Sequence, residues 1–282
     1  MFTLTATNSS GKSLQITQNS SYKLTAIDGL TSPTASINSS TIAGSDGSLF
    51  NSAKVESRNI VFTIFFEPPI EKNRINLYRF FHIKDLVSIR YTNGSRDVTI
   101  AGYVESLEGS LFEMRQSVQV SILCLQPYFK SAAEIVEELS QTLDSFEFPF
   151  SIDLTGIPFS EIDKTYMQNV YNNGDVSCGM IIELQATGTV VNPTIYDATN
   201  RTFMGLDKTL QAGDLVVINT NVGEKSIVLK SGGKTSNIIN EISPGSTWFQ
   251  IEPGETVFAY EVEDGEEWLS VTFHHNDLYG GV

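Results

Sequence analysis

Cysteine is scarce in this chain, with only Cys124 and Cys178 among 282 residues. A secreted disulfide scaffold carries more cysteines at tighter spacing, so we expect two buried, reduced thiols. Long apolar runs are also missing, since none approaches the ~20 residues that a membrane helix needs. The first residues, MFTLTATNSS, lack the basic and apolar regions of a signal peptide. The sequence therefore predicts a soluble protein, made in the cytosol, without membrane insertion.

Basic residues are few, because 18 Lys and Arg face 33 Asp and Glu, which gives a net charge of −15. A duplex-binding protein needs a basic stripe to displace counterions from phosphate. The acidity instead predicts repulsion from DNA and from anionic membranes. Two interpretations stay open: the charge serves solubility alone, or it belongs to a surface past which DNA moves without binding.

The sequence also lacks recognisable catalytic, metal-binding and phosphate-binding motifs. The three histidines are His82, His274 and His275, and neighbouring residues in a strand point to opposite faces, so the last two cannot easily share a metal. Carboxylates crowd into residues 261–267, where a solvated turn is expected rather than an acid and base pair. SGGKTS at 231–236 lacks the upstream glycine of a phosphate-binding loop. We expect no catalytic residues, no metal, no cofactor and no enzyme.

Strands and turns dominate the pattern that is present. The N-terminal half predicts strands at 22–30, 58–69, 86–91, 98–104 and 117–129, with Asn93-Gly94 as a hairpin turn between the third and fourth. Residues 71–84 predict a helix whose apolar face combines Ile75, Tyr78 and Phe81 with Leu77. In the C-terminal half, 171–184 and 212–229 each place a Gly-Asp turn before a strand, and the second contains a hairpin.

The segment 31–53 is rich in Ser, Thr, Asn and Gly. Such a segment cannot bury enough apolar surface to pack its own core, so it is a long loop or an extended arm. We expect this arm to reach a neighbouring subunit and to add main-chain bonds to its sheet. The candidate arm residues are Ser36, Asn38, Ile42, Asp46 and Phe50.

A change of pattern marks the middle of the chain. Ser131 to Glu134 has the spacing of a helix capping box, and Ile135, Leu139 and Leu143 follow at four-residue intervals, which predicts a short helix. We expect an N-terminal domain at 1–133, a connector at 134–149 and a C-terminal domain at 150–282.

Aromatic residues crowd the last forty positions. Exposed rings can serve as platforms for sugars, and Trp268 and Trp248 are the candidates, Trp268 being flanked by Glu266 and Glu267. The alternative is that these rings supply core at alternate strand positions.

Several motifs together resemble the distal tail proteins of long-tailed, non-contractile phages of Gram-positive bacteria. In the N-terminal half they are IDGL at 27–30, SRNIVFTIFF at 57–66, INLYRFF, and SVQVSILCLQPYF at 117–129. In the C-terminal half they are NNGDVSCGMIIEL, NPTIYD at 192–197, GDLVVINTNVGEKSI and the closing LYGGV at 278–282. The C-terminal half resembles the galectin-like domain of the larger members.

The resemblance implies a mainly β fold, with an N-terminal sandwich-like ring domain carrying a short helix and a C-terminal galectin-like jelly roll. It implies a structural virion protein, a hexameric ring at the tail tip that joins the tail tube to the receptor-binding apparatus. The implied partners are the major tail (tube) protein, a tail-associated lysin or tail fibre protein, and receptor-binding proteins, with DNA passing through the lumen. Assembly is expected in the bacterial host cytoplasm. The alternative function is a carbohydrate-binding or host-adhesion module.

Overall fold

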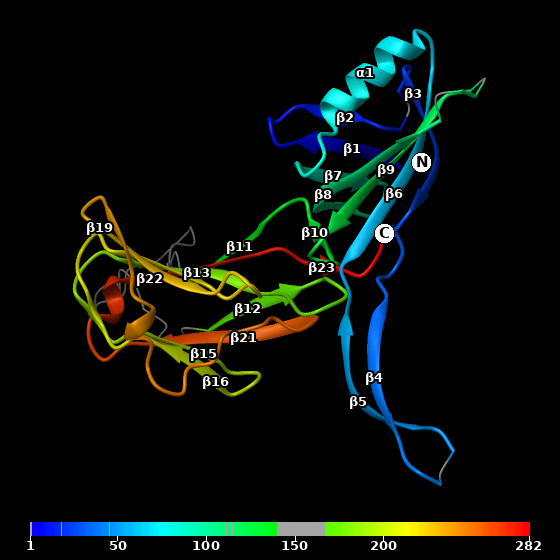
Figure 1. Ribbon diagram of the computed structural model, residues 1–282. Helices are drawn as coiled ribbons and strands as arrows, with labels where there is room; N and C mark the ends of the chain where they lie inside the picture. Colours follow the sequence, from blue (N-terminus) through cyan, green and yellow to red (C-terminus); the bar gives the residue numbers. More distant parts are fainter. Residues whose placement is uncertain (1, 18, 45, 111, 114, 140–166) are drawn as a thin grey trace, which may run out of the picture. The chain divides into compact units, whose positions relative to one another are not determined.

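The computed structural model describes residues 2–17, 19–44, 46–110, 112–113, 115–139 and 167–282 (Figure 1). The chain divides into two compact units. Unit 1 comprises Met1–Ala133 and Leu278–Val282, and unit 2 comprises Glu134–Asp277. Among the described residues the fold is mainly antiparallel β-sheet with one α-helix, so the expected fold class is confirmed.

Unit 1 is built around one large antiparallel sheet. Its strands are β1 (Thr3–Asn8), β2 (Ser13–Gln15), β3 (Tyr22–Asp28), β6 (Arg58–Phe66), β7 (Leu86–Thr92), β8 (Asp97–Gly109), β9 (Ser117–Cys124), β10 (Phe129–Ser131) and β23 (Leu278–Tyr279). The main path runs in the order β2-β1-β7-β8-β9-β6-β3, and β10 pairs with both β8 and β23. The predicted hairpin at Asn93-Gly94 is confirmed, because β7 pairs with β8 across it. A separate pair, β4 (Ala35–Thr41) with β5 (Ser48–Val55), extends beyond this sheet (Figure 1).

Alternation along the strands creates the core of unit 1. In β6, every second side chain from Arg58 to Phe66 is buried, as expected for a strand with one face on the core. The helix α1 (Ile70–Phe80) begins directly after two prolines, and the ring of Phe81 at its end packs 5.6 Å from that of Phe62.

The predicted apolar face of this helix is wrong in part. Leu77 and Phe81 are buried, but Ile75 and Tyr78 are exposed, and Asn73 is the third buried side chain. Positions 73, 77 and 81 are separated by four residues and so lie on one side of the helix. The Asn73 side chain donates to the carbonyl of Glu67 at 2.8 Å, which explains why a polar residue can face the core.

Unit 2 is a sandwich of two antiparallel sheets. The first has the order β11-β22-β13-β18-β19-β20 and the second the order β12-β21-β15-β16, with a small extra pair β14-β17. The strands are β11 (Ile135–Leu139), β12 (Met167–Asn172), β13 (Met180–Ala186), β14 (Val190–Val191), β15 (Thr194–Asp197), β16 (Thr202–Gly205), β17 (Thr209–Leu210), β18 (Leu215–Asn219), β19 (Ser226–Ser231), β20 (Lys234–Asn237), β21 (Gly254–Glu261) and β22 (Leu269–His275), with short 3₁₀ turns at Ile239–Glu241 and Glu266–Trp268. The rings of Phe258 in β21 and Phe273 in β22 lie 5.0 Å apart, which joins the two sheets face to face. The predicted hairpin within 212–229 is confirmed by the pairing of β18 with β19.

The short helix predicted after Ser131 is wrong where the structure describes it. Ile135–Leu139 form strand β11, which pairs with β22 through five residues, from Ile135↔His275 to Leu139↔Val271. Tertiary contacts override the helical spacing here, since Leu139 is buried where it pairs with Val271. The rest of the expected connector, 140–149, lies outside the described residues.

The last five residues of the chain return to unit 1. In β23, Tyr279 pairs with Phe129 and Leu278 with Lys130. Val282 then donates its backbone N–H to the carbonyl of Leu30 at 3.0 Å. The LYGGV motif, expected at the end of the C-terminal domain, therefore completes the N-terminal unit.

Candidate assembly surfaces

The arm expected at 31–53 is a β-hairpin in which every described residue of β4 and β5 is exposed. The seven cross-strand pairs run from Ala35↔Val55 to Thr41↔Ser48. An isolated two-stranded hairpin is at best marginally stable in water, so such a hairpin gains stability from a third strand or from a packed face. We refer to residues 35–55 as the arm.

The arm has one apolar face, which a bulge completes. Cross-strand partners share a face, so Ala35, Ile37, Ala53 and Val55 lie together. The register shifts between Asn38 and Ser39, and the shift pairs Phe50 with Ser39, on the same side as Ile37. Without the bulge, Phe50 would point to the opposite face. Ile37 and Phe50 are 67% and 68% exposed, which is unusual for side chains of their size.

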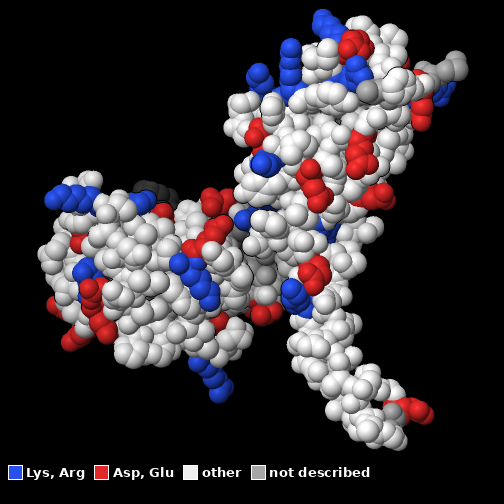
Figure 2. Space-filling model, viewed as in Figure 1, with Lys and Arg blue, Asp and Glu red and all other residues white. Residues whose placement is uncertain are grey.

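The candidate arm residues divide between the two faces and the tip. Phe50 lies on the apolar face, and Ser36 and Asn38 lie on the opposite face, where Leu49 is the one large apolar side chain of the two strands. Ile42 and Asp46 lie in the connection between the strands, where both are exposed. Figure 2 shows that the arm is almost free of charged atoms except near its tip. Asp46 and Lys54 are its only charged residues.

The root of the arm is held by three segments of unit 1. Glu56 donates its N–H to the carbonyl of Thr34 at 3.0 Å, which closes the hairpin. Arg58, which is buried, donates to the carbonyls of Gly29 and Gly280, and its guanidinium lies 4.7 Å from the centre of the Phe129 ring. The arm is therefore fixed where it leaves the sheet and free beyond it.

The two tryptophans lie apart from this surface, in unit 2. Trp268 is 46% exposed, and one face of its indole packs on Gly188, where an added Cβ would lie 2.5 Å from Cγ. Trp248 is half-buried, and Lys225 Nζ lies 5.5 Å from its ring centre. By contrast Phe249, Phe258 and Tyr260 are buried, so most of the aromatic cluster is core.

The histidines of strand β22 face opposite sides, as predicted. His274 Nδ1 lies 3.7 Å from Glu134 and its Nε2 lies 3.8 Å from Glu183. His275 points into the sandwich with its side chain fully buried, and its Nδ1 lies 3.8 Å from Asp277. Burial lowers the pKa of His275, although the nearby Asp277 opposes this. Within the described part of the chain, no group of three or more His, Cys, Asp and Glu residues could hold a metal ion.

Both cysteines are free and buried, as expected. Burial raises the pKa of the Cys124 thiol to about 11 and that of Cys178 to about 12. Because the thiolate is the reactive form, neither group is poised for nucleophilic chemistry at neutral pH.

The net charge is distributed very unevenly between the units. Unit 1 carries 12 Lys and Arg against 10 Asp and Glu, a net of +2, whereas unit 2 carries 6 against 23, a net of −17. Residues 235–282 contain nine acidic residues and no Lys or Arg. The negative charge of the chain therefore lies in unit 2. The resemblance implies that unit 1 forms the ring, and the net charge of unit 1 does not predict an acidic surface there.

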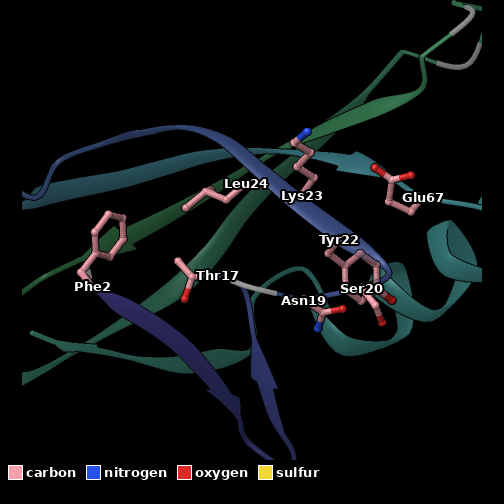
Figure 3. Close-up of a pocket in the computed structure, with 8 residues that line it drawn as sticks. All are labelled: Phe2, Thr17, Asn19, Ser20, Tyr22, Lys23, Leu24 and Glu67. Carbon is pink, nitrogen blue, oxygen red and sulfur yellow. The ribbon is translucent and has the colours of Figure 1, made fainter.

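Sequence reasoning did not anticipate a hollow of about 730 Å³ in unit 1. It is lined by Phe2, Thr17, Asn19, Ser20, Tyr22, Lys23, Leu24 and Glu67 (Figure 3). Several of its polar groups already bond to the protein: Thr17 accepts from the Leu4 N–H, Asn19 binds Gln15 and Ser21, and Tyr22 donates to the Asn73 carbonyl. We therefore assign no ligand to it.

Comparison with known proteins finds one family model that matches part of the chain. Residues 173–276, most of unit 2, match the family model described as the siphovirus-type tail component, C-terminal domain. Unit 2 is therefore similar to the C-terminal domain of siphovirus-type tail components. No curated protein matches the sequence of the chain. Among the described residues, no helix has the length and apolarity to span a membrane.

Solved structures share the fold across nearly the whole length of the chain. The crystal structure of the Dit protein of phage SPP1, described as a paradigm of the hub adsorption apparatus in phages infecting Gram-positive bacteria, aligns with a TM-score of 0.69 at 14% identity, covering 98% of each chain. Chains from the baseplate of phage P2, in its activated conformation with calcium or with strontium, align with TM-scores of 0.53 and 0.52 at 12% identity, again covering 98% of each chain. The family model describes a tail component, and its match covers residues 173–276 of this chain.

Proposed function

We propose that this chain is the distal tail protein at the tip of a siphovirus tail, where six copies form a ring. In this proposal unit 1 forms the ring and unit 2 projects from it. The ring joins the major tail (tube) protein to the tail-associated lysin or tail fibre protein and to receptor-binding proteins, and DNA passes through its lumen without specific binding. Assembly takes place in the cytoplasm of the bacterial host.

The observation that carries this proposal is the arm. A hairpin whose apolar face is exposed reaches away from its own sheet, and such a face favours contact with another molecule. A contact between the arm of one copy and a different surface of the next copy is heterologous, and heterologous contacts close into a ring when the rotation divides a full turn. The likeness to the Dit protein of phage SPP1 supports the same role.

The arm can be removed cleanly to test this proposal. Residues 35–55 would be replaced by Asn-Gly, because Thr34 and Glu56 are already joined by a hydrogen bond and can flank a two-residue turn. The wild-type protein should form six-fold rings in negative-stain electron micrographs and a hexamer in light scattering. The shortened protein should remain folded by circular dichroism but monomeric. A shortened protein that still forms hexamers would show that the ring interface lies elsewhere.

A carbohydrate-binding module is the second candidate, favoured by one observation. Trp268 presents an exposed indole whose opposite face is supported by Gly188. A flat, supported ring of this kind suits stacking against a sugar. A glycan-binding screen of wild-type protein against Trp268→Ala tests this candidate, with Trp248→Ala as the comparison. Binding that survives both substitutions would remove these two residues from the site.

A further inference from the structure

Two Asn-Gly pairs occur in the chain, Asn93-Gly94 in unit 1 and Asn173-Gly174 in unit 2. In such a pair the backbone nitrogen of the glycine can attack the side-chain amide carbon of the asparagine, because glycine has no Cβ to hinder the approach. The product is a five-membered succinimide ring, which water opens to aspartate or isoaspartate. The two pairs are equivalent as dipeptides, but their hydrogen bonds differ.

The side chain of Asn93 folds back over the turn between β7 and β8. Its Oδ1 accepts hydrogen bonds from the backbone N–H groups of Ser95 at 2.8 Å and of Arg96 at 2.7 Å. Both donors follow Gly94 in the chain, so these bonds hold the amide carbon of Asn93 over the Gly94 peptide. Two N–H donors at such distances also stabilise the oxyanion that forms when the amide carbon is attacked.

The attacking nitrogen, that of Gly94, is open to solvent. Gly94 is exposed, and its N–H makes no hydrogen bond to another described residue. A Cβ added at Gly94 would meet no atom within 4 Å, so water and hydroxide can reach this peptide. Hydroxide can therefore remove the N–H proton without breaking a hydrogen bond of the fold.

The second pair is held in a less reactive arrangement. Gly174 donates its N–H to Asn172 Oδ1 at 2.8 Å, and Asn173 donates its own N–H to Asp277 Oδ1 at 3.1 Å. The acceptor is fixed in turn, because Asn172 is buried and its Nδ2 donates to two backbone carbonyls. Attack by the Gly174 nitrogen requires its hydrogen bond to break first, which raises the barrier at Asn173.

We propose that Asn93 is a site of spontaneous deamidation in the folded protein and that the fold protects Asn173. Hydroxide removes the N–H proton of Gly94, and the nitrogen forms a bond to Cγ of Asn93. The Cγ–Nδ2 bond then breaks, and Nδ2 takes a proton from water and leaves as ammonia. Water next adds to the succinimide. Addition at Cγ breaks the new N–Cγ bond and gives aspartate, whereas addition at the backbone carbonyl carbon breaks the original peptide bond and gives isoaspartate.

Deamidation would change both the charge and the bonding of this turn. A carboxylate at position 93 lowers the net charge of unit 1 from +2 to +1. It also removes the Nδ2 donor, which bonds the hydroxyl of Tyr91 at 3.1 Å. The neighbouring Arg96 has its guanidinium 4.2 Å from the centre of the Tyr279 ring in β23. The new negative charge therefore lies close in the chain to a residue that contacts the returning C-terminal segment.

Peptide mass spectrometry of aged protein tests the proposal, with Asn173 as a control inside the same chain. The purified full-length protein would be kept at pH 8 and sampled over several weeks. The peptide containing Asn93 should gain about 1 Da and separate into aspartate and isoaspartate forms. Its rate should exceed that of the peptide containing Asn173 by about tenfold or more, which corresponds to ~1.4 kcal/mol in the barrier.

One variant and one condition separate the effect of the fold from that of the dipeptide. Gly94→Ala fits the open space around Gly94 and should slow the reaction at Asn93 while leaving the circular dichroism unchanged. In guanidinium chloride both turns lose their hydrogen bonds, so the two rates should become equal. Equal rates in the folded protein would overturn the proposal. A difference that persists unchanged in the unfolded chain would also overturn it, because flanking sequence would then be the cause. Neither result depends on the proposed ring.

Discussion

The guanidinium of Arg58 donates a hydrogen bond to the carbonyl of Gly280, a residue 222 positions further along the chain. The same guanidinium donates to Gly29, so one side chain joins the segment before the arm, the segment after it and the end of the chain. The root of the arm therefore depends on a residue that lies beyond the whole of unit 2 in the sequence.

Arg58→Ala should destabilise unit 1 by roughly 2–4 kcal/mol, because it removes two hydrogen bonds that a buried, charged donor makes. Denaturant unfolding monitored by circular dichroism measures the loss. Arg90→Ala is the matched control, since the Arg90–Asp97 pair is exposed and should contribute about 1 kcal/mol or less. Equal losses in the two variants would contradict a special role of Arg58.

Gly29→Ala should be more damaging than an ordinary glycine replacement. Gly29 has φ +85°, and a Cβ there would lie 2.2 Å from the carbonyl oxygen of Asn59. The positive φ costs about 1 kcal/mol, and the overpacking adds roughly 1–3 kcal/mol. Gly11→Ala has a similar φ of +77° with open space around it, so it isolates the first contribution. Urea unfolding of both variants measures the difference. Equal urea midpoints for Gly29→Ala and Gly11→Ala would contradict a clash at Gly29.

Unit 2 should lose stability in mild acid because of His275. Its pKa is lowered by burial from the ordinary 6.5, so the unfolded chain binds a proton more readily than the folded unit. The stability contribution is full above pH 6.5 and is lost as the pH falls from 6.5 through the folded pKa. Thermal unfolding between about pH 8 and pH 5 should show this slope.

His275→Gln should flatten that slope, and His82→Gln in unit 1 should not. Glu137 acts in the opposite sense, because burial raises its pKa above 4.5 and its contribution is lost as the pH rises. The pH dependence of stability is therefore assigned to His275 only if it disappears in His275→Gln. If His275→Gln retains the pH dependence, another group causes it.

The two thiols should be inert in the folded protein. With pKa values of about 11 for Cys124 and about 12 for Cys178, both remain protonated at pH 8 and both are buried. Titration with a chromogenic disulfide reagent at pH 8 should detect no rapid reaction before denaturation and two thiols per chain afterwards. Fast labelling of one thiol in the native protein would contradict the burial.

Residues 134–277 should fold without the rest of the chain, because both sheets of the sandwich are complete within them. A fragment covering 150–277 lacks β11, which pairs with β22 through five residues, and should unfold at a lower temperature. Calorimetry of the two fragments makes the comparison. Identical transitions would mean that β11 contributes little to the sandwich.

Much of this fold could be predicted from local patterns. The Asn93-Gly94 turn and the alternation in 58–66 and 117–124 indicate their strands directly, because turn chemistry and burial act over short distances. The helix expected from Ile135 onward is wrong at Ile135–Leu139, because four-residue spacing also fits a strand at the edge of a sandwich, and pairing with β22 decides between them.

The surfaces of the arm could be predicted only in part. Composition indicates that 31–53 has no core of its own, but Ser, Thr and Asn at alternate positions give no strand signal. The apolar face depends on a bulge at Asn38, which brings Phe50 to the same side as Ile37. The bulge is set by the pairing of β4 with β5, which residue spacing alone does not encode.

The return of residues 278–282 to unit 1 has a consequence for the order of events during translation. A ribosome makes unit 2 before it makes β23, so a nascent chain can form most of the unit 1 sheet early but cannot seat Arg58 against Gly280. The root of the arm becomes rigid only after both units have emerged. Before β23 is made, the arm therefore lacks the hydrogen bond from Arg58 to Gly280 that holds its base.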